Sequence, residues 1–139
     1  MKSGHHSLRR AALAAALTMQ GLVVQAAPDA SRGERLYVRC MACHALAMDR
    51  VGPRHCGLID RRAGSVAGFH YTAAMRKSGL VWDEKTLHRF LQHPLKVVPG
   101  SSMTYDGMPD AAERSDLIAY LKQVNNDAAC RASQEGYRP

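Results

Sequence analysis

The sequence has few aromatic residues, no strand-like stretch and no block of like charge. Its aromatic side chains are one tryptophan, five tyrosines and two phenylalanines. No alternation of apolar and polar residues indicates a β-strand, and no repeat or low-complexity tract is visible. Because no basic run is interleaved with aromatic residues, nucleic-acid binding has little support. The chain must fold with few large apolar side chains.

Cysteine is also scarce, and the four cysteines divide into one close pair and two isolated residues. Cys40 and Cys43 are three residues apart, whereas Cys56 and Cys130 stand alone. A zinc site would require a second Cys or His pair at ligand spacing, which the sequence lacks. A thioredoxin-like redox motif would require a βαβ context, and no strand pattern surrounds the pair.

His44 directly follows the close pair, and the run Cys40-Met41-Ala42-Cys43-His44 is typical of covalent attachment of a c-type haem. One helical turn presents both sulfurs on the same side, where they can form thioether bonds to two vinyl groups of one porphyrin. The adjacent imidazole then reaches the iron. The motif therefore predicts one haem c held through Cys40 and Cys43. A non-haem disulfide exchanger that uses the two thiols is the alternative.

The only long apolar run lies near the N-terminus. A positively charged start precedes an Ala- and Leu-rich run from residue 11 to 24, and small residues follow it. This pattern indicates an export signal that is cleaved before Ala27. The run is too short and too alanine-rich to favour a stable membrane span, and an uncleaved N-terminal anchor is the alternative. We expect residues 1–26 to be a signal peptide and residues 27–139 to be a single domain with a short C-terminal tail.

Four helices are predicted in this domain. Ser31 and Glu34 have the spacing of a capping box, which predicts a helix that starts near Arg32. Gly33 lies on the apolar stripe of this helix, where glycine indicates the close approach of another backbone. The other three helices are expected to start at the N-caps Thr72, Asp83 and Asp110 and to end near Arg76, Gln92 and Asn125.

Long irregular segments join the predicted helices. Residues 45–65 are rich in Gly, Pro and Arg, and residues 97–105 form a second loop with a thioether at its tip. A chain of this size rarely leaves so much of itself in loops without something for them to surround, and a buried porphyrin would supply that core. A metal-bound His usually donates its second ring N–H to a fixed acceptor, and a carbonyl of the Gly52-Pro53 turn is the candidate for His44.

From Gly33 to about Lys122 the chain resembles the class I cytochrome c family, the small single-haem electron carriers. The matching elements occur in order: Gly33 with Tyr37, Cys40 to His44, Gly52-Pro53, Arg61 with Gly64, residues 69–72, Trp82, Pro94, Pro99-Gly100 with Met103, and residues 114–121. The resemblance implies an all-α class I cytochrome c fold, with about four helices and long loops wrapped around one covalently bound haem.

The resemblance also implies roles for individual residues. Cys40 and Cys43 would carry the thioether bonds, His44 would be the proximal iron ligand and Met103 the distal one. Further contacts to the haem are expected from Pro53, Arg61, Tyr71, Trp82 and Ser101; of these, Tyr71, Trp82 and Arg61 would serve a propionate. Rival thioethers and imidazoles occur at Met41, Met48, Met75, Met108, His55, His70, His88 and His93. Pro99-Gly100 favours Met103, because it forms a loop that can aim a side chain inward.

The chain departs from the family pattern at several positions, some of them near the expected haem. His55 stands where a leucine usually contacts the haem, and we expect the polar ring to tilt outward. Asp60 stands where glycine is usual, so a left-handed backbone is expected at an Asp. Cys56 and Cys130 are additional, and the family fold brings the loop after Pro53 near the end of the last helix. We therefore predict a Cys56–Cys130 disulfide, with two free thiols as the alternative.

The resemblance implies an electron carrier and not an enzyme, because filled axial positions leave no open iron site for a substrate or for oxygen. A haem enzyme or gas-binding protein with a labile distal ligand is the alternative. The expected location is the periplasm. Expected partners are a quinol-oxidising complex or periplasmic dehydrogenase as donor and a terminal oxidase as acceptor. Removal of the three basic residues of the signal lowers the net charge from +7 to +4, which suits an acidic protein partner. We expect a monomer that meets the membrane only through its partners.

Overall fold

The computed structural model describes residues 26–136, so all but the last residue of the predicted signal peptide lies outside the described residues. Within this range the chain forms six helices and one isolated β-bridge, between Arg62 and Val81. The helices are α1 (Ala30–Tyr37), α2 (Ala73–Lys77), α3 (Glu84–Gln92), α4 (Pro94–Val97), α5 (Ala111–Asn125) and α6 (Ala128–Glu135). The all-α prediction is confirmed.

Three of the four predicted helix starts are confirmed. Thr72, Asp83 and Asp110 are the N-caps of α2, α3 and α5, and each side chain accepts a hydrogen bond from the amide three residues on. These bonds satisfy amides that the first turn of a helix leaves without an intrahelical partner.

The predicted start of the first helix is wrong. Asp29, not the Ser31 capping box, is the N-cap, because its carboxylate accepts hydrogen bonds from the amides of both Ser31 and Arg32. The amide of Asp29 in turn donates to a carboxylate oxygen of Asp116 on α5, 2.7 Å away. This tertiary contact favours Asp29 as the N-cap over Ser31, the residue that the local sequence pattern favours.

The described residues include two helices beyond the four that were expected, α4 and α6, and α6 precedes the last four residues of the chain. α4 has only four residues, with proline at its first position. Cys130 is the one buried residue of α6. Neither helix therefore has an apolar stripe that periodicity could reveal.

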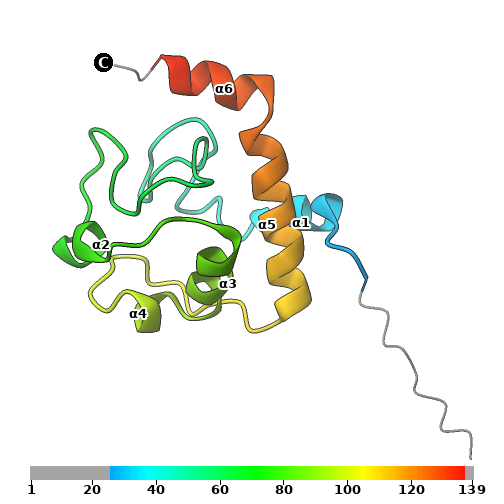
Figure 1. Ribbon diagram of the computed structural model, residues 1–139, viewed down its shortest axis with the longest axis horizontal. Helices are drawn as coiled ribbons and strands as arrows, with labels where there is room; N and C mark the ends of the chain where they lie inside the picture. Colours follow the sequence, from blue (N-terminus) through cyan, green and yellow to red (C-terminus); the bar gives the residue numbers. More distant parts are fainter. Residues whose placement is uncertain (1–25, 137–139) are drawn as a thin grey trace, which may run out of the picture.

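α1 packs across α5, and the crossing depends on Gly33 (Figure 1). A Cβ atom at Gly33 would lie 2.0 Å from the carbonyl oxygen of Asp116, so no other residue fits without separating the helices. Beside this contact the rings of Tyr37 and Tyr120 pack with centroids 5.3 Å apart. The close backbone approach predicted for Gly33 is confirmed.

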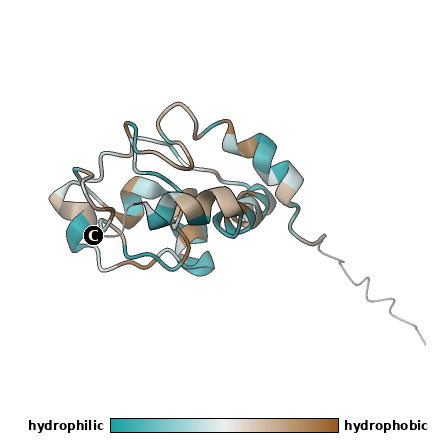
Figure 2. Ribbon diagram, turned by 90° about the horizontal axis from the view of Figure 1, so that it is seen from above, coloured by the Kyte–Doolittle hydropathy of each residue, from teal (hydrophilic) through white to brown (hydrophobic). Residues whose placement is uncertain are grey.

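Loops form most of the molecule on the other side of α5, and α2, α3 and α4 are set among them (Figure 1). α3 packs against α5 and α4, and α6 leads away from the end of α5. Hydrophobic residues are interspersed with hydrophilic ones along both helices and loops (Figure 2). The left-handed backbone predicted at Asp60 is present, with φ of 61°. No helix between residues 26 and 136 is long and apolar enough to cross a bilayer.

Candidate haem site

The cysteine motif begins directly after α1 and continues its hydrogen bonding. The amide of Cys40 donates to the carbonyl of Tyr37 at 2.8 Å, and the amide of His44 donates to the carbonyl of Cys40 at 2.9 Å. Both thiols are unpaired; Cys40 is half-buried and Cys43 is exposed. Two free thiols and an imidazole therefore lie together in one tight turn that follows α1.

His44 is held firmly by the turn that follows it. Its Nδ1 lies 2.8 Å from the carbonyl oxygen of Pro53, so the predicted hydrogen bond is present and Nε2 is the nitrogen left for a metal. A Cβ at Gly52 would lie 2.2 Å from Cε1 of the ring, so the Gly52 backbone rests against the imidazole. Burial lowers the pKa of His44, and the Pro53 hydrogen bond opposes this effect. The ring is neutral at pH 7, as a metal ligand must be.

All nine residues predicted from the sequence line one cavity of about 320 Å³. They are Cys40, Cys43, His44, Pro53, Arg61, Tyr71, Trp82, Ser101 and Met103. The motif turn, the 45–72 segment, the 98–110 loop and the helices α2, α3 and α5 all contribute to this wall. The rest of the lining is largely apolar and includes Leu58, Phe69, Leu87, Phe90, Leu91, Leu117 and Leu121.

The rival ligands separate into two groups. Met75, Met108 and His55 line the cavity, whereas Met41, Met48, His70, His88 and His93 do not. Met103 lies on the loop, where its amide donates to the hydroxyl of Ser101 at 3.1 Å. Ser101 therefore shapes the loop that presents Met103.

Arg61 brings a positive charge to the cavity wall, and its buried Nε–H has no hydrogen-bond partner. Two of its other nitrogens donate to the carbonyls of Cys56 and Arg54, at 3.1 and 3.0 Å. Burial lowers the pKa of Arg61 and raises that of Tyr71, and each group favours the charged form of the other. A buried guanidinium with an unused donor is suited to an anionic group such as a carboxylate.

The expectation that His55 tilts outward is wrong. Its ring stacks on the His44 ring, with centroids 4.3 Å apart and planes inclined by 22°. Its Nδ1 lies 3.0 Å from the hydroxyl of Tyr37, and this hydrogen bond satisfies a polar atom that would otherwise turn toward water. Sequence reasoning missed this residue because its partner lies 18 positions earlier, on another element.

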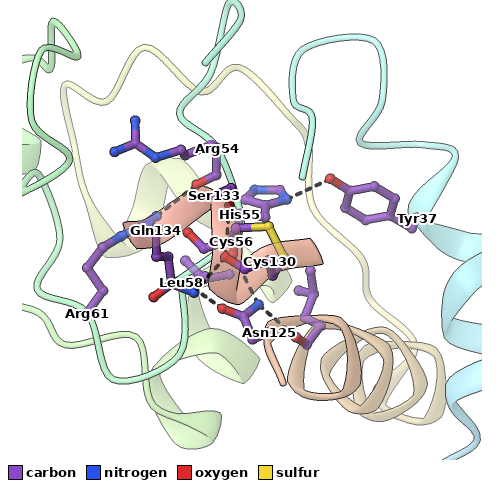
Figure 3. Close-up of a disulfide and its surroundings, with 11 residues drawn as sticks. Tyr37, Arg54, His55, Cys56, Leu58, Arg61, Asn125, Cys130, Ser133 and Gln134 are labelled. Atoms are coloured by element: carbon purple, nitrogen blue, oxygen red, sulfur yellow. Dashed lines mark hydrogen bonds between the residues drawn. A yellow bond between two sulfur atoms is a disulfide. The ribbon is translucent and has the colours of Figure 1, made fainter. Parts of the chain in front are cut away.

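A disulfide between Cys56 and Cys130 joins the loop after Pro53 to α6, with Cα atoms 5.0 Å apart (Figure 3). Asn125, at the end of α5, reinforces this junction. Its side-chain amide donates to the carbonyl of His55 at 3.1 Å and accepts from the amide of Leu58 at 2.8 Å. The end of α5 and the whole of α6 thus hold the loop that includes His55.

The donor set fits a covalently attached haem. Two free thiols and an imidazole meet a largely apolar cavity, and a buried guanidinium N–H lacks a partner there. No group of three or more His, Cys, Asp or Glu among residues 26–136 is placed to hold a bare metal ion. Burial raises the pKa of the Cys40 thiol to about 11, which disfavours the thiolate that a disulfide exchanger requires.

Comparisons with known proteins agree with this site. The profile of the family described as Cytochrome c matches residues 30–125. Cytochrome c2 of Rhodoblastus acidophilus is 40% identical over 106 residues, which cover 74% of this chain and 99% of that protein. Cytochrome c2 of Blastochloris viridis is 38% identical over 107 residues, 75% of this chain and 84% of that protein.

A solved structure supports the same assignment. Cytochrome cH from Methylobacterium extorquens superposes with a TM-score of 0.67 at 40% identity, covering 68% of this chain and 98% of that one. The family profile, the relatives and the shared fold lead to one conclusion. The chain belongs to the class I cytochrome c family, electron carriers rather than enzymes, and it binds one haem c covalently through Cys40 and Cys43.

Proposed function

We propose that this chain is a periplasmic one-electron carrier in which His44 and Met103 are the two axial ligands of the haem iron. The observation that carries the proposal is the cavity itself, which both side chains line together with the two thiols of the motif. His44 is fixed by Pro53, and Met103 lies on a loop that Ser101 organises.

The residues of this chain contribute to this function by positioning the haem and its ligands and by excluding water. When bound, the haem supplies a one-electron iron couple, and a thioether ligand favours its reduced form. The Pro53 carbonyl keeps His44 in one tautomer, with Nε2 free for the iron. Arg61 and Tyr71 offer donors to a propionate, and Trp82 is a third candidate from the same wall. The apolar lining keeps water from the iron, so that little reorganisation accompanies electron transfer.

Methionine variants test the ligand set directly. Met103→Leu is compared with Met75→Leu and Met108→Leu, because Met75 and Met108 line the same cavity and serve as matched controls. We expect Met103→Leu alone to lose the methionine-to-iron charge-transfer band of the oxidised protein and to bind carbon monoxide when reduced. Carbon monoxide binding by the untreated wild-type protein at neutral pH would contradict the proposal and support a gas-binding haem protein.

Export and cleavage belong to the same proposal. A bacterial host that matures c-type haem should yield a protein that begins at Ala27 and is found in the periplasmic fraction. Mass spectrometry should show one covalent haem and no alkylated cysteine before reduction, because Cys56 and Cys130 form a disulfide. A membrane-bound product that retains residues 1–26 would instead support an uncleaved anchor.

The proposed partners are protein redox partners of the periplasm. The donor is a quinol-oxidising complex or a periplasmic dehydrogenase, and the acceptor is a terminal oxidase. The net charge of +4 after signal removal favours partners with acidic docking faces. In this proposal the protein is a monomer and contacts the membrane only through these partners. Electron transfer to such partners should weaken as ionic strength rises.

A further inference from the structure

One polar side chain of the cavity wall has no part in the function described so far. His55 lines the cavity beside Leu58 and Cys43, and its ring is stacked on the ring of His44. Burial holds the pKa of His55 well below its usual value, and the neighbouring His44 and Arg61 lower it further. His55 is therefore a neutral ring at pH 7, and its effect is through contact rather than charge.

The position of His55 is over-determined by its surroundings. Its amide donates to the carbonyl of Ala45 at 3.1 Å, and its carbonyl accepts from the side chain of Asn125 at 3.1 Å. The next residue, Cys56, is bonded to α6 (Figure 3). With its backbone held from two sides, the His55 ring has little freedom apart from its own rotation.

The hydroxyl of Tyr37 removes that remaining freedom. It lies 3.0 Å from Nδ1 of His55, and the two rings meet edge to face with centroids 5.6 Å apart (Figure 3). Tyr37 is itself 4% exposed, and its ring also packs on Tyr120 at the crossing of α1 and α5. A chain of contacts thus leads from the helix crossing through Tyr37 and His55 to His44.

His44 needs support against rotation of its plane. The Pro53 carbonyl fixes Nδ1, but a single hydrogen bond in the plane of a ring leaves the ring free to rock about that direction. The backbone of Gly52 and the imidazole of His55 both lie against the His44 ring. We propose that His55, locked by the hydroxyl of Tyr37, is a positioning residue that sets the plane of the His44 imidazole.

This inference rests on the proposed function, because it takes His44 to be an iron ligand. The orientation of an axial imidazole plane sets the spread of the haem methyl signals in the proton NMR spectrum of the oxidised protein. Because the orientation of Met103 also contributes to that spread, a changed spread reports the His44 plane where the methionine charge-transfer band and methyl signal remain those of the wild type. Reduction potential is a second readout, because it responds to the dipoles around the iron.

Three variants and one control test the inference. Tyr37→Phe removes only the hydroxyl, His55→Leu removes the stacked ring at similar volume, and the double variant combines them. Tyr120→Phe is the matched control, because it removes a hydroxyl from the ring on the other side of Tyr37. We expect the methyl spread to change in Tyr37→Phe and to change more in His55→Leu, with no further change in the double variant. Tyr120→Phe should resemble the wild type.

Two results would overturn the inference. One is a wild-type methyl spread in both Tyr37→Phe and His55→Leu. The other is an effect of Tyr37→Phe that is equally large when His55 is absent, because the hydroxyl would then act by another route. The methionine charge-transfer band separates this test from that of the proposed function. If it persists in these variants while the methyl spread is unchanged, the ligand set stands and the role of His55 fails.

Discussion

Removing the Cys56–Cys130 disulfide should destabilise the protein without changing the two ligands of the haem iron. The bond joins residues 74 positions apart and connects the loop after Pro53 to α6 (Figure 3). α6 buries only Cys130, so the disulfide is its main attachment to the rest of the molecule. Neither His44 nor Met103 lies within α6. The perturbation is therefore the double variant Cys56→Ser/Cys130→Ser.

The expected magnitude follows from the length of the closed loop. Closing a loop of this length removes chain entropy from the unfolded state worth about 4.5 kcal/mol at 25 °C. This figure is an upper limit, because a haem whose iron is still coordinated to the unfolded chain already restricts part of the same loop. We expect the double variant to lose about 2 to 4.5 kcal/mol of unfolding free energy.

The assay is equilibrium unfolding in guanidinium chloride, followed by tryptophan fluorescence and by the haem absorption band. Trp82 lies in the cavity wall, so its fluorescence reports separation from the haem. Wild-type protein with its disulfide reduced should match the double variant in stability. At one oxidation state of the iron, the native absorption spectrum should be the same in the wild type, the disulfide-reduced wild type and the double variant. A loss below about 1 kcal/mol, or a changed spectrum in the folded variant, would refute the reasoning.

Three further predictions concern two glycines that have no room for a Cβ atom and one buried carboxylate. Gly33→Ala should lower the unfolding free energy by about 1 to 3 kcal/mol in chemical denaturation. The new Cβ would clash with the backbone of α5, and this cost exceeds the gain in helix propensity from glycine to alanine. Gly52→Ala should reduce the yield of holoprotein or alter its low-spin spectrum, because the Cβ would lie 2.2 Å from the His44 ring. Hydrogen bonds from Arg32 and from the amide of Asp29 hold the pKa of Asp116 below its usual value, so its ionised form stabilises the fold above about pH 4 and this contribution is lost as the pH falls through the lowered pKa. The unfolding free energy of Asp116→Asn should therefore fall less steeply below about pH 4 than that of the wild type. An unchanged pH dependence would contradict this assignment.

Helices with a local start signal could be predicted from the sequence, and helices held by tertiary contacts could not. Thr72, Asp83 and Asp110 cap their helices through bonds to amides three residues away, a distance that the sequence itself displays. Asp29 was missed because its advantage includes a bond to Asp116, 87 positions later. α6 was missed because it is attached through one buried cysteine and has no apolar stripe.

The site shows the same division. Covalent attachment at Cys40 and Cys43 follows from spacing, and the hydrogen-bond acceptor for the adjacent His44 follows from a rigid turn nearby. The environment of His55 does not follow from any sequence pattern, because histidine is found both in protein interiors and on surfaces. Its burial depends on a tyrosine that meets it only after α1 and the following loop have packed together.

In the proposed function, Met103 alone among the methionines would be a ligand of the haem iron, together with His44. Proton–carbon NMR of the oxidised protein with labelled methionine methyl groups tests it most directly, because a methyl bonded through sulfur to paramagnetic iron is shifted far from all others. We predict one such signal, absent from Met103→Leu and retained in Met75→Leu and Met108→Leu. A shifted signal that survives Met103→Leu, or the absence of any shifted methyl in the wild type, would contradict the account.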